Sequence, residues 1–174
     1  MEPDWDEAII YLRKHSNPKR VDDYIEAYET LVVPAKKGDR TAYIKLGDWY
    51  SSRGRDLAAQ DWYKKSIAAG NLAAHQPLDS VTKDNQEKRQ NYVEGAAKGD
   101  LFSKVQLART YLYDNKILSG SPEYDLAIQY LQEGMKSADD KVSNNAFDAL
   151  VDLYRDGIKD KKESLIALKT NKNI

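Results

Sequence analysis

The sequence predicts an all-α protein, an α-solenoid in which antiparallel helix hairpins stack on one another. The 174 residues are rich in Ala, Leu, Lys, Glu and Asp, and no stretch alternates apolar and polar residues for long enough to form a strand. Apolar residues recur instead at helical spacing. The dipeptide GD or GN ends three such stretches, at Asp39, Asn71 and Asp100. This interval of about 30 residues is typical of two-helix repeats.

The predicted organisation has three parts. Residues 1–20 form an N-terminal capping helix, residues 21–157 form about four helix hairpins, and residues 158–174 form a short C-terminal capping helix and tail. Trp5 precedes the repeats, and we expect it to cover the first hairpin rather than to contact a partner. Pro34 lies inside a helical pattern, so we expect a kink or an early helix end there.

The clearest hairpin lies between Gly38 and Gly70. Its first helix has a core stripe at Ala42, Leu46, Gly47 and Tyr50. Its second helix has a core stripe at Ala59, Trp62, Tyr63, Ser66 and Ile67. Gly54 separates the two helices, and Gly70 suits the left-handed conformation that ends a helix. Small residues within the stripes allow the helix backbones to approach closely.

The same pattern returns after Gly99. The corresponding stripes consist of Ser103, Leu107, Ala108 and Tyr111, and then of Ala127, Tyr130, Leu131, Gly134 and Met135. A further first helix carries Ala146, Leu150 and Tyr154, and further second helices carry Ala27, Leu31 and Tyr92. Between Gly70 and Gly99 the first helix contains Pro77, so we expect it to be short or bent.

This pattern resembles the Sel1-like repeat family, which is related to the tetratricopeptide repeat. AYIKLGDWY at 42–50 and AAQDWYKKSIAAG at 58–70 match the family pattern closely, and QNYVEGAAKG at 90–99 matches its second half. The units at 100–137 and 141–157 match less well. The resemblance covers roughly residues 20–157. It implies a binding scaffold or adaptor, and usually not an enzyme.

Motifs for catalysis or for metal and cofactor binding are absent from the sequence. His15 and His75 are the two histidines, there is no cysteine, and we expect both histidines to be exposed or to cap a helix. The adjacent aspartates at 22–23 and 139–140 suit helix N-termini. We therefore expect no enzymatic activity, cofactor or metal. A hydrolase with a converging carboxylate pair is the less favoured alternative.

Charge and hydropathy exclude further classes. Lys and Arg total 27 and Asp and Glu total 28, so the cationic excess typical of nucleic-acid binding is absent. No run of about 18 apolar residues is present, and we expect no membrane span. The acidic start MEPDWDEA has no apolar signal region. The sequence as given indicates a cytoplasmic protein, or a periplasmic one if a leader has been removed.

The concave surface of a solenoid is its usual binding surface. The residues that we expect to bind a partner lie beside the core stripes: Asp48, Trp49, Ser52, Arg109, Tyr113, Asp148, Asp152 and Arg155. They predict a mixed groove with an acidic end, suited to a basic or polar protein surface. Trp49, Tyr113 and Arg109 are the candidate anchors, since Trp, Tyr and Arg dominate binding hot spots.

Some small bacterial proteins of this repeat type are immunity proteins, and the segment RVDDYIEAYETLVVPAKKGDRTAYIKLGDWY resembles that group. The resemblance implies an inhibitor that covers the catalytic mouth of a cognate antibacterial toxin, such as a type VI secretion lipase effector. The interface would measure roughly 800 Å² per partner or more. A general adaptor in a bacterial complex is the alternative. Partner identity and oligomeric state stay open at this point.

Overall fold

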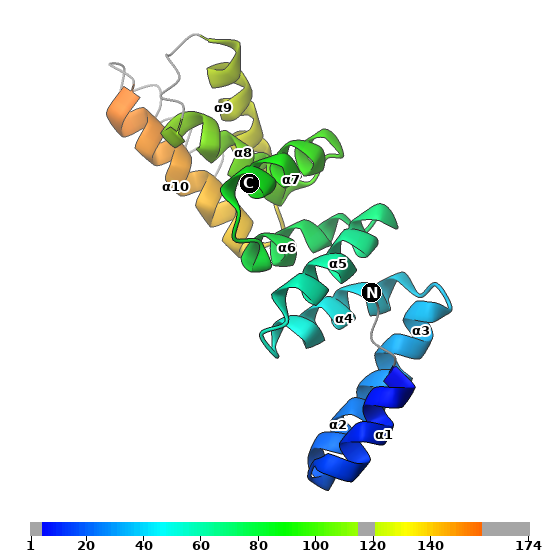
Figure 1. The fold of residues 1–174 in the computed structure, drawn as a ribbon. Helices are drawn as coiled ribbons and strands as arrows, with labels where there is room; N and C mark the ends of the chain where they lie inside the picture. Colours follow the sequence, from blue (N-terminus) through cyan, green and yellow to red (C-terminus); the bar gives the residue numbers. More distant parts are fainter. Residues whose placement is uncertain (1–4, 115–120, 158–174) are drawn as a thin grey trace. The chain divides into compact units, whose positions relative to one another are not determined.

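The computed structural model describes residues 5–114 and 121–157, which form helices and no strand (Figure 1). The predicted all-α class is therefore confirmed. The chain divides into two compact units, Met1–Lys83 and Asp84–Ile174. The predicted capping helix and tail at 158–174 lie outside the described residues.

Each unit is a set of successive helices. In the first unit these are α1 (Trp5–His15), α2 (Pro18–Ala27), the π-helical turn η1 (Tyr28–Val32), α3 (Val33–Lys36), α4 (Arg40–Ser51), α5 (Asp56–Ala68), the 3-10 turn η2 (Leu72–Ala74) and α6 (His75–Val81). In the second unit they are α7 (Asn85–Ala97), α8 (Leu101–Asp114), α9 (Pro122–Gly134) and α10 (Asp140–Gly157).

Helices α1 and α2 lie side by side at the start of the first unit (Figure 1). Helix α1 ends at His15 after Arg13 and Lys14, and three basic residues in a last turn suit the helix dipole. Asn17 caps α2 by accepting a hydrogen bond from the N–H of Arg20 at 3.0 Å. Helix α2 therefore begins three residues before the predicted repeat boundary at residue 21.

The irregularity that we expected at Pro34 lies just before it. In the π-helical turn, the N–H of Val33 donates to the carbonyl oxygen of Tyr28, five residues back. Pro34 then falls in the first turn of α3, where its missing N–H costs nothing. The helical path consequently continues to Lys36 instead of ending at the proline.

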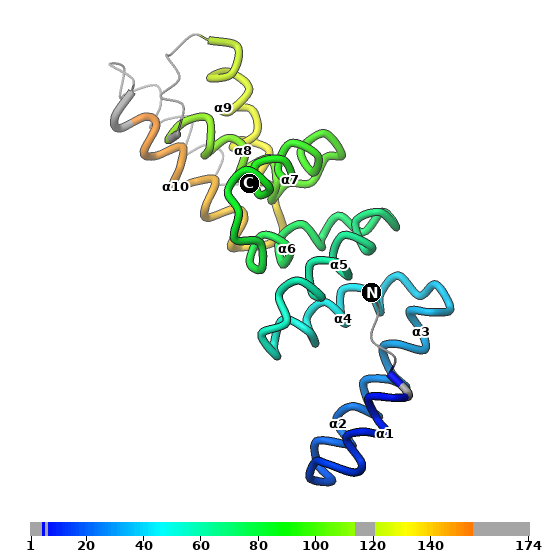
Figure 2. The backbone as a smooth tube through the Cα atoms, viewed as in Figure 1, coloured from blue at the N-terminus to red at the C-terminus, as the bar shows by residue number. Residues whose placement is uncertain are grey.

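Helices α4 and α5 form the clearest hairpin, and the backbone trace reverses between them (Figure 2). Both predicted core stripes are buried. Leu46 and Ala59 are fully buried, and Tyr63 is 2% exposed. Gly54 lies in the turn with a φ of 69°, a conformation that glycine adopts without strain.

Helices α8 and α9 bury most of the positions that correspond to buried residues of this hairpin, whereas Tyr111, Tyr130 and Met135 are only half-buried. The pairs of corresponding residues that are buried in both hairpins include Leu46 with Leu107, Ala59 with Ala127, Tyr63 with Leu131, and Ser66 with Gly134. Helix α10 packs against both α8 and α9, and its predicted core residues Ala146 and Leu150 are also buried. Burial therefore follows the sequence register.

The recurring GD and GN steps share one turn geometry. The glycines are Gly38, Gly70 and Gly99, with φ values of 88°, 89° and 89°. The N–H groups of Asp39, Asn71 and Asp100 each donate at 3.0 Å to the carbonyl five residues back, which is the Schellman ending of a helix. The carboxylates of Asp39 and Asp100 then cap the next helix, accepting from the N–H groups of Thr41 and Ser103.

The segment after Gly70 is short and irregular, as Pro77 predicts. A 3-10 turn leads into α6, which has only 7 residues and packs against α5. The amide of Gln60 in α5 donates to the carbonyl of Val81 at 2.8 Å. His75 is only 4% exposed. The expectation of an exposed or capping histidine is thus wrong for His75, because α6 turns this residue into the core.

Candidate protein-binding groove

An aromatic cluster closes the first hairpin of the first unit. Trp5 is 5% exposed, and its ring centroid lies 5.1 Å from that of Trp49 and 5.9 Å from that of Tyr24. Tyr50 meets both tryptophan rings edge-on. Trp5 therefore packs as a cover on α2 and α4, as the sequence predicts.

The predicted partner-binding residues on α4 and at its C-cap make contacts within the chain. The hydroxyl of Tyr63 donates to Asp48 at 2.8 Å, and Ser52 Oγ donates to the carbonyl of Trp49 at 2.9 Å. The Arg53 guanidinium lies 3.9 Å from the centroid of the half-buried Trp49 ring, which is a cation–π contact. Trp49 and Arg53 line a hollow of about 270 Å³ together with Asp23, Glu26, Ala27, Thr30 and Leu31.

A larger groove lies between α7 and α8 in the second unit, with a volume of about 600 Å³. Its lining residues are Asn85, Gln86, Lys88, Arg89 and Tyr92 of α7, and Gln106, Arg109, Thr110 and Tyr113 of α8. Two of the predicted site residues, Arg109 and Tyr113, thus lie in one concave surface.

Helical spacing places the lining side chains of α7 on one side of that helix and those of α8 on one side of the other, so that both sides line the groove. Helix α7 begins after Asp84, whose carboxylate accepts from the N–H of Glu87 at 2.7 Å. Lys88 and Arg89 precede Tyr92 by four and three residues, so the three side chains share one face of α7. The α8 lining residues follow the same three-and-four spacing.

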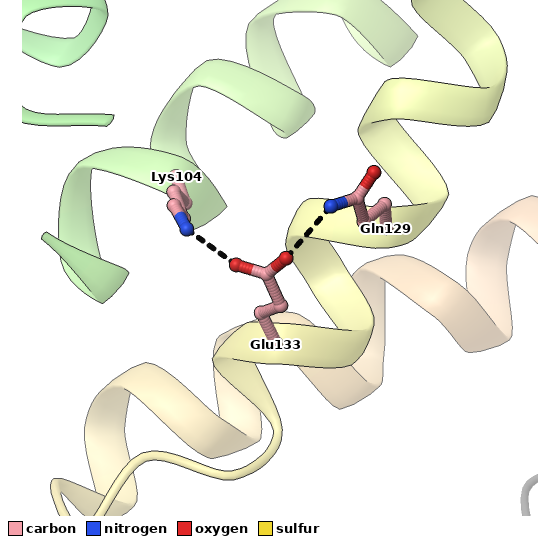
Figure 3. Close-up of polar contacts among 3 residues, drawn as sticks. All are labelled: Lys104, Gln129 and Glu133. Atoms are coloured by element: carbon pink, nitrogen blue, oxygen red, sulfur yellow. Dashed lines mark hydrogen bonds and ion pairs between the residues drawn. The ribbon is translucent and has the colours of Figure 1, made fainter. Parts of the chain in front are cut away.

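An ion pair holds α8 against α9. The ammonium of Lys104 in α8 contacts Glu133 in α9, and the amide of Gln129 donates to the other carboxylate oxygen at 2.9 Å (Figure 3). The hydrogen bond from Lys104 lowers the pKa of Glu133 below its ordinary value, and the hydrogen bond from Gln129 lowers it further by a smaller amount. Glu133 is therefore ionised and the contact is charged at neutral pH.

The lining residues of the groove carry three cations and no carboxylate. Within the described residues, no carboxylate forms an ion pair with Arg89 or Arg109. The predicted mixed groove with an acidic end runs along the first helix of each repeat, so its charge stays a prediction. The α7–α8 groove is a different surface, and it is cationic because α7, with Lys88 and Arg89, supplies the wall opposite Arg109.

The acidic candidates of α10 lie outside this lining. Asp152 accepts a hydrogen bond from the hydroxyl of Tyr113 at 3.2 Å, which links α10 to the end of α8. Asp148 is exposed. The side chain of Arg155 lies outside the part of the chain that the structure describes. The structure thus brings together three of the eight candidates, Arg109, Tyr113 and Asp152.

Sequence reasoning missed the α7 wall of the groove. We assigned binding to the first helix of each repeat, whereas α7 corresponds to a second helix. The signal was present in EKRQNY at 87–92, where two cations lie one turn before a tyrosine. A solvated charged face gives the same pattern, so the sequence alone does not separate the two.

In residues 5–114 and 121–157, no three His, Asp or Glu residues lie close enough together to hold a metal ion. No helix of the described chain combines the length and apolar character needed to cross a membrane. Comparisons of the chain with protein-family models, with curated proteins and with solved structures find no match.

Proposed function

We propose that this chain is a non-enzymatic protein-binding protein built as a solenoid of Sel1-like helix hairpins. Two features support the solenoid. The α4–α5 and α8–α9 hairpins bury corresponding residues, and three helices end in the same Schellman turn followed by Asp or Asn. In repeat proteins such shared registers arise because each hairpin buries its apolar face against the next.

The observation that carries the binding function is the α7–α8 groove. It combines Tyr92 and Tyr113 with Arg89 and Arg109, and Tyr113 remains 49% exposed although it is a large ring. Tyr and Arg are the residue types that most often dominate protein interfaces, because each buries a large surface and also forms hydrogen bonds. A groove with both types suits a protein partner.

The proposed biological role is that of an immunity protein. The chain would bind a cognate antibacterial toxin, such as a type VI secretion lipase effector, and block its catalytic mouth sterically. The support for this role is the resemblance of residues 20–50 to small immunity proteins of this repeat type. An interface of roughly 800 Å² per partner is within reach of a helical surface of this size.

The experiment is purification of the tagged chain from its source bacterium, followed by identification of the bound protein and an assay of its activity. One stoichiometric partner with toxin or lipase activity, inhibited by the added chain, supports the immunity role. Several substoichiometric partners point to the adaptor alternative. A stoichiometric partner whose activity the chain leaves unchanged contradicts inhibition.

A further inference from the structure

We infer that the α7–α8 groove recognises a short acidic segment of the partner protein, by pairing the carboxylates of that segment with Lys88, Arg89 and Arg109. This inference deepens the proposed protein-binding function and rests on it. The acidic segment differs from the basic or polar surface that the sequence predicts for the mixed groove, because the lining of the α7–α8 groove is cationic.

Charge complementarity supports this choice. Arg89 is exposed and Arg109 is half-buried, and both belong to a lining without a carboxylate. The cation of a half-buried arginine is stabilised by a neighbouring anion. A carboxylate that enters the groove supplies this anion and can form two parallel hydrogen bonds with each guanidinium.

The dimensions of the groove limit the segment to a few residues. On α7 the lining runs from Asn85 to Tyr92, and on α8 it runs from Gln106 to Tyr113. Seven residue steps of a helix span about 10 Å. That length accommodates about three residues of extended chain. Three cations therefore face two or three carboxylates at most.

The neutral lining residues favour a peptide over a nucleic acid. Asn85, Gln86 and Gln106 each offer an amide donor and an amide acceptor, which match the N–H and C=O groups of an extended backbone. The whole chain has a formal net charge of −1, and binding to a phosphate backbone requires a broad cationic surface. A groove of about 10 Å spans only about three phosphates along one strand of a duplex.

The experiment titrates the full chain with a labelled peptide that carries three glutamates flanked by Gly and Ser, and follows fluorescence anisotropy at near-physiological salt. The comparison probes are the matched glutamine peptide, the matched lysine peptide and an oligothymidylate of similar length. The variants are Arg89→Gln, Arg109→Gln and their double variant. The matched control is Lys141→Gln, which removes one exposed cation of the same unit outside the groove.

We expect the glutamate peptide to bind at least tenfold more tightly than the glutamine and lysine peptides. The double variant should lose that preference, and Lys141→Gln should retain it. Circular dichroism confirms the fold of each variant. Because Arg89 is exposed, Arg89→Gln keeps the test valid even if substitution of the half-buried Arg109 unfolds the unit.

Two results overturn the inference. Equal binding of the glutamate and glutamine peptides shows that the groove does not recognise carboxylates. Tighter binding of the oligothymidylate than of the glutamate peptide, lost in the same variants, assigns the groove to single-stranded nucleic acid instead.

Failure of the inference and failure of the proposed function give different results. If the purified partner binds the double variant as tightly as the unmodified chain, the chain binds protein through another surface. If the chain retains no partner at all, the protein-binding function fails, whatever the peptide titration shows.

Discussion

Gly47 of α4 lies against the ring of Tyr63 of α5 so closely that a Cβ atom at Gly47 would lie 2.2 Å from Cε1 of Tyr63. Real Cβ atoms essentially never make such a contact, so any side chain at this position requires the Tyr63 ring to shift. At the corresponding positions the α8–α9 hairpin has Ala108 and the smaller Leu131, which belong to one core cluster. In each pair a smaller residue of the first helix accompanies a larger residue of the second.

We therefore predict that Gly47→Ala destabilises the protein by about 1–3 kcal/mol, because it overpacks the hairpin. The helix propensity of alanine by itself would stabilise the helix by about 1 kcal/mol, so the sign of the change is informative. The measurement is the midpoint of urea unfolding. A stabilised variant contradicts the account of the close approach.

Replacing Gly47 and Tyr63 by the residues found at the corresponding positions of the α8–α9 hairpin tests whether the two hairpins correspond. The double variant Gly47→Ala with Tyr63→Leu reproduces the pair found at Ala108 and Leu131. We expect it to be more stable than the sum of the two single changes allows, because the leucine vacates the space of the ring. Urea unfolding of the four proteins gives the coupling. Additive effects contradict the shared register.

The hydrogen bond from Tyr63 to Asp48 gives a prediction at high pH. Burial, and then the neighbouring Asp48, raise the pKa of Tyr63 above its ordinary value of about 10. The neutral ring thus stabilises the fold fully below about pH 10, and this stability falls as the pH rises further. Tyr63→Phe should cost about 0.5–1.5 kcal/mol at neutral pH.

Unfolding curves of this variant between about pH 8 and pH 11 provide the check. Tyr63→Phe should show a smaller loss of stability over this interval than the unmodified chain. Tyr11→Phe, which changes an exposed tyrosine, is the matched control. Identical alkaline slopes for all three proteins contradict the buried hydrogen bond.

The contact of Lys104 with Glu133 gives a prediction at low pH. Because the folded pKa of Glu133 is lowered, its contribution to stability is complete above about pH 4.5 and is lost as the pH falls through the folded value. Glu133→Gln should therefore destabilise the protein at neutral pH and reduce the acid dependence of unfolding.

The matched control for Glu133 is Glu123→Gln, an exposed carboxylate of the same helix. Thermal unfolding at about pH 7 and about pH 3 compares the three proteins. We expect the difference between the Glu133 variant and the unmodified chain to shrink at the lower pH. A difference that stays constant assigns the loss to packing instead of charge.

The turn at Gly99 provides a prediction for the repeat boundary. Gly99→Ala should destabilise the protein by about 1 kcal/mol, because the left-handed φ of 89° strains any residue with a side chain. Lys98→Ala, at the preceding exposed position, is the control and should have little effect. The measurement is the midpoint of urea unfolding of each variant. A Gly99→Ala variant as stable as the unmodified chain contradicts the Schellman ending.

Much of the fold could be predicted from local patterns. The core stripes of α4, α5, α8 and α9 follow from helical periodicity, and the turn glycines follow from their place after each stripe. The π-helical turn before Pro34 could not be predicted, because a kink, an early helix end and a widened turn each relieve the same clash between the proline ring and the carbonyl four residues back. The burial of His75 depends on packing between α5 and α6, which no local pattern encodes.

The candidate site was predicted less completely. Arg109 and Tyr113 were found from their place beside a core stripe, and they line the groove. Lys88 and Arg89 were missed because exposed cations on a helix look alike whether they face a groove or open solvent. Trp49 stays a predicted partner anchor, and in the structure its ring packs against Trp5 and Arg53 and lines the smaller hollow.

The most direct test of the central claim is the affinity of the purified cognate partner for the unmodified chain and for the Arg89→Gln, Arg109→Gln double variant. Titration calorimetry at two salt concentrations measures it, with Lys141→Gln as control. The account predicts one-to-one binding whose affinity is at least tenfold lower for the double variant than for the unmodified chain. Added salt should also weaken the binding of the double variant less than it weakens the binding of the unmodified chain. Equal affinity and equal salt dependence for the two proteins would contradict the account.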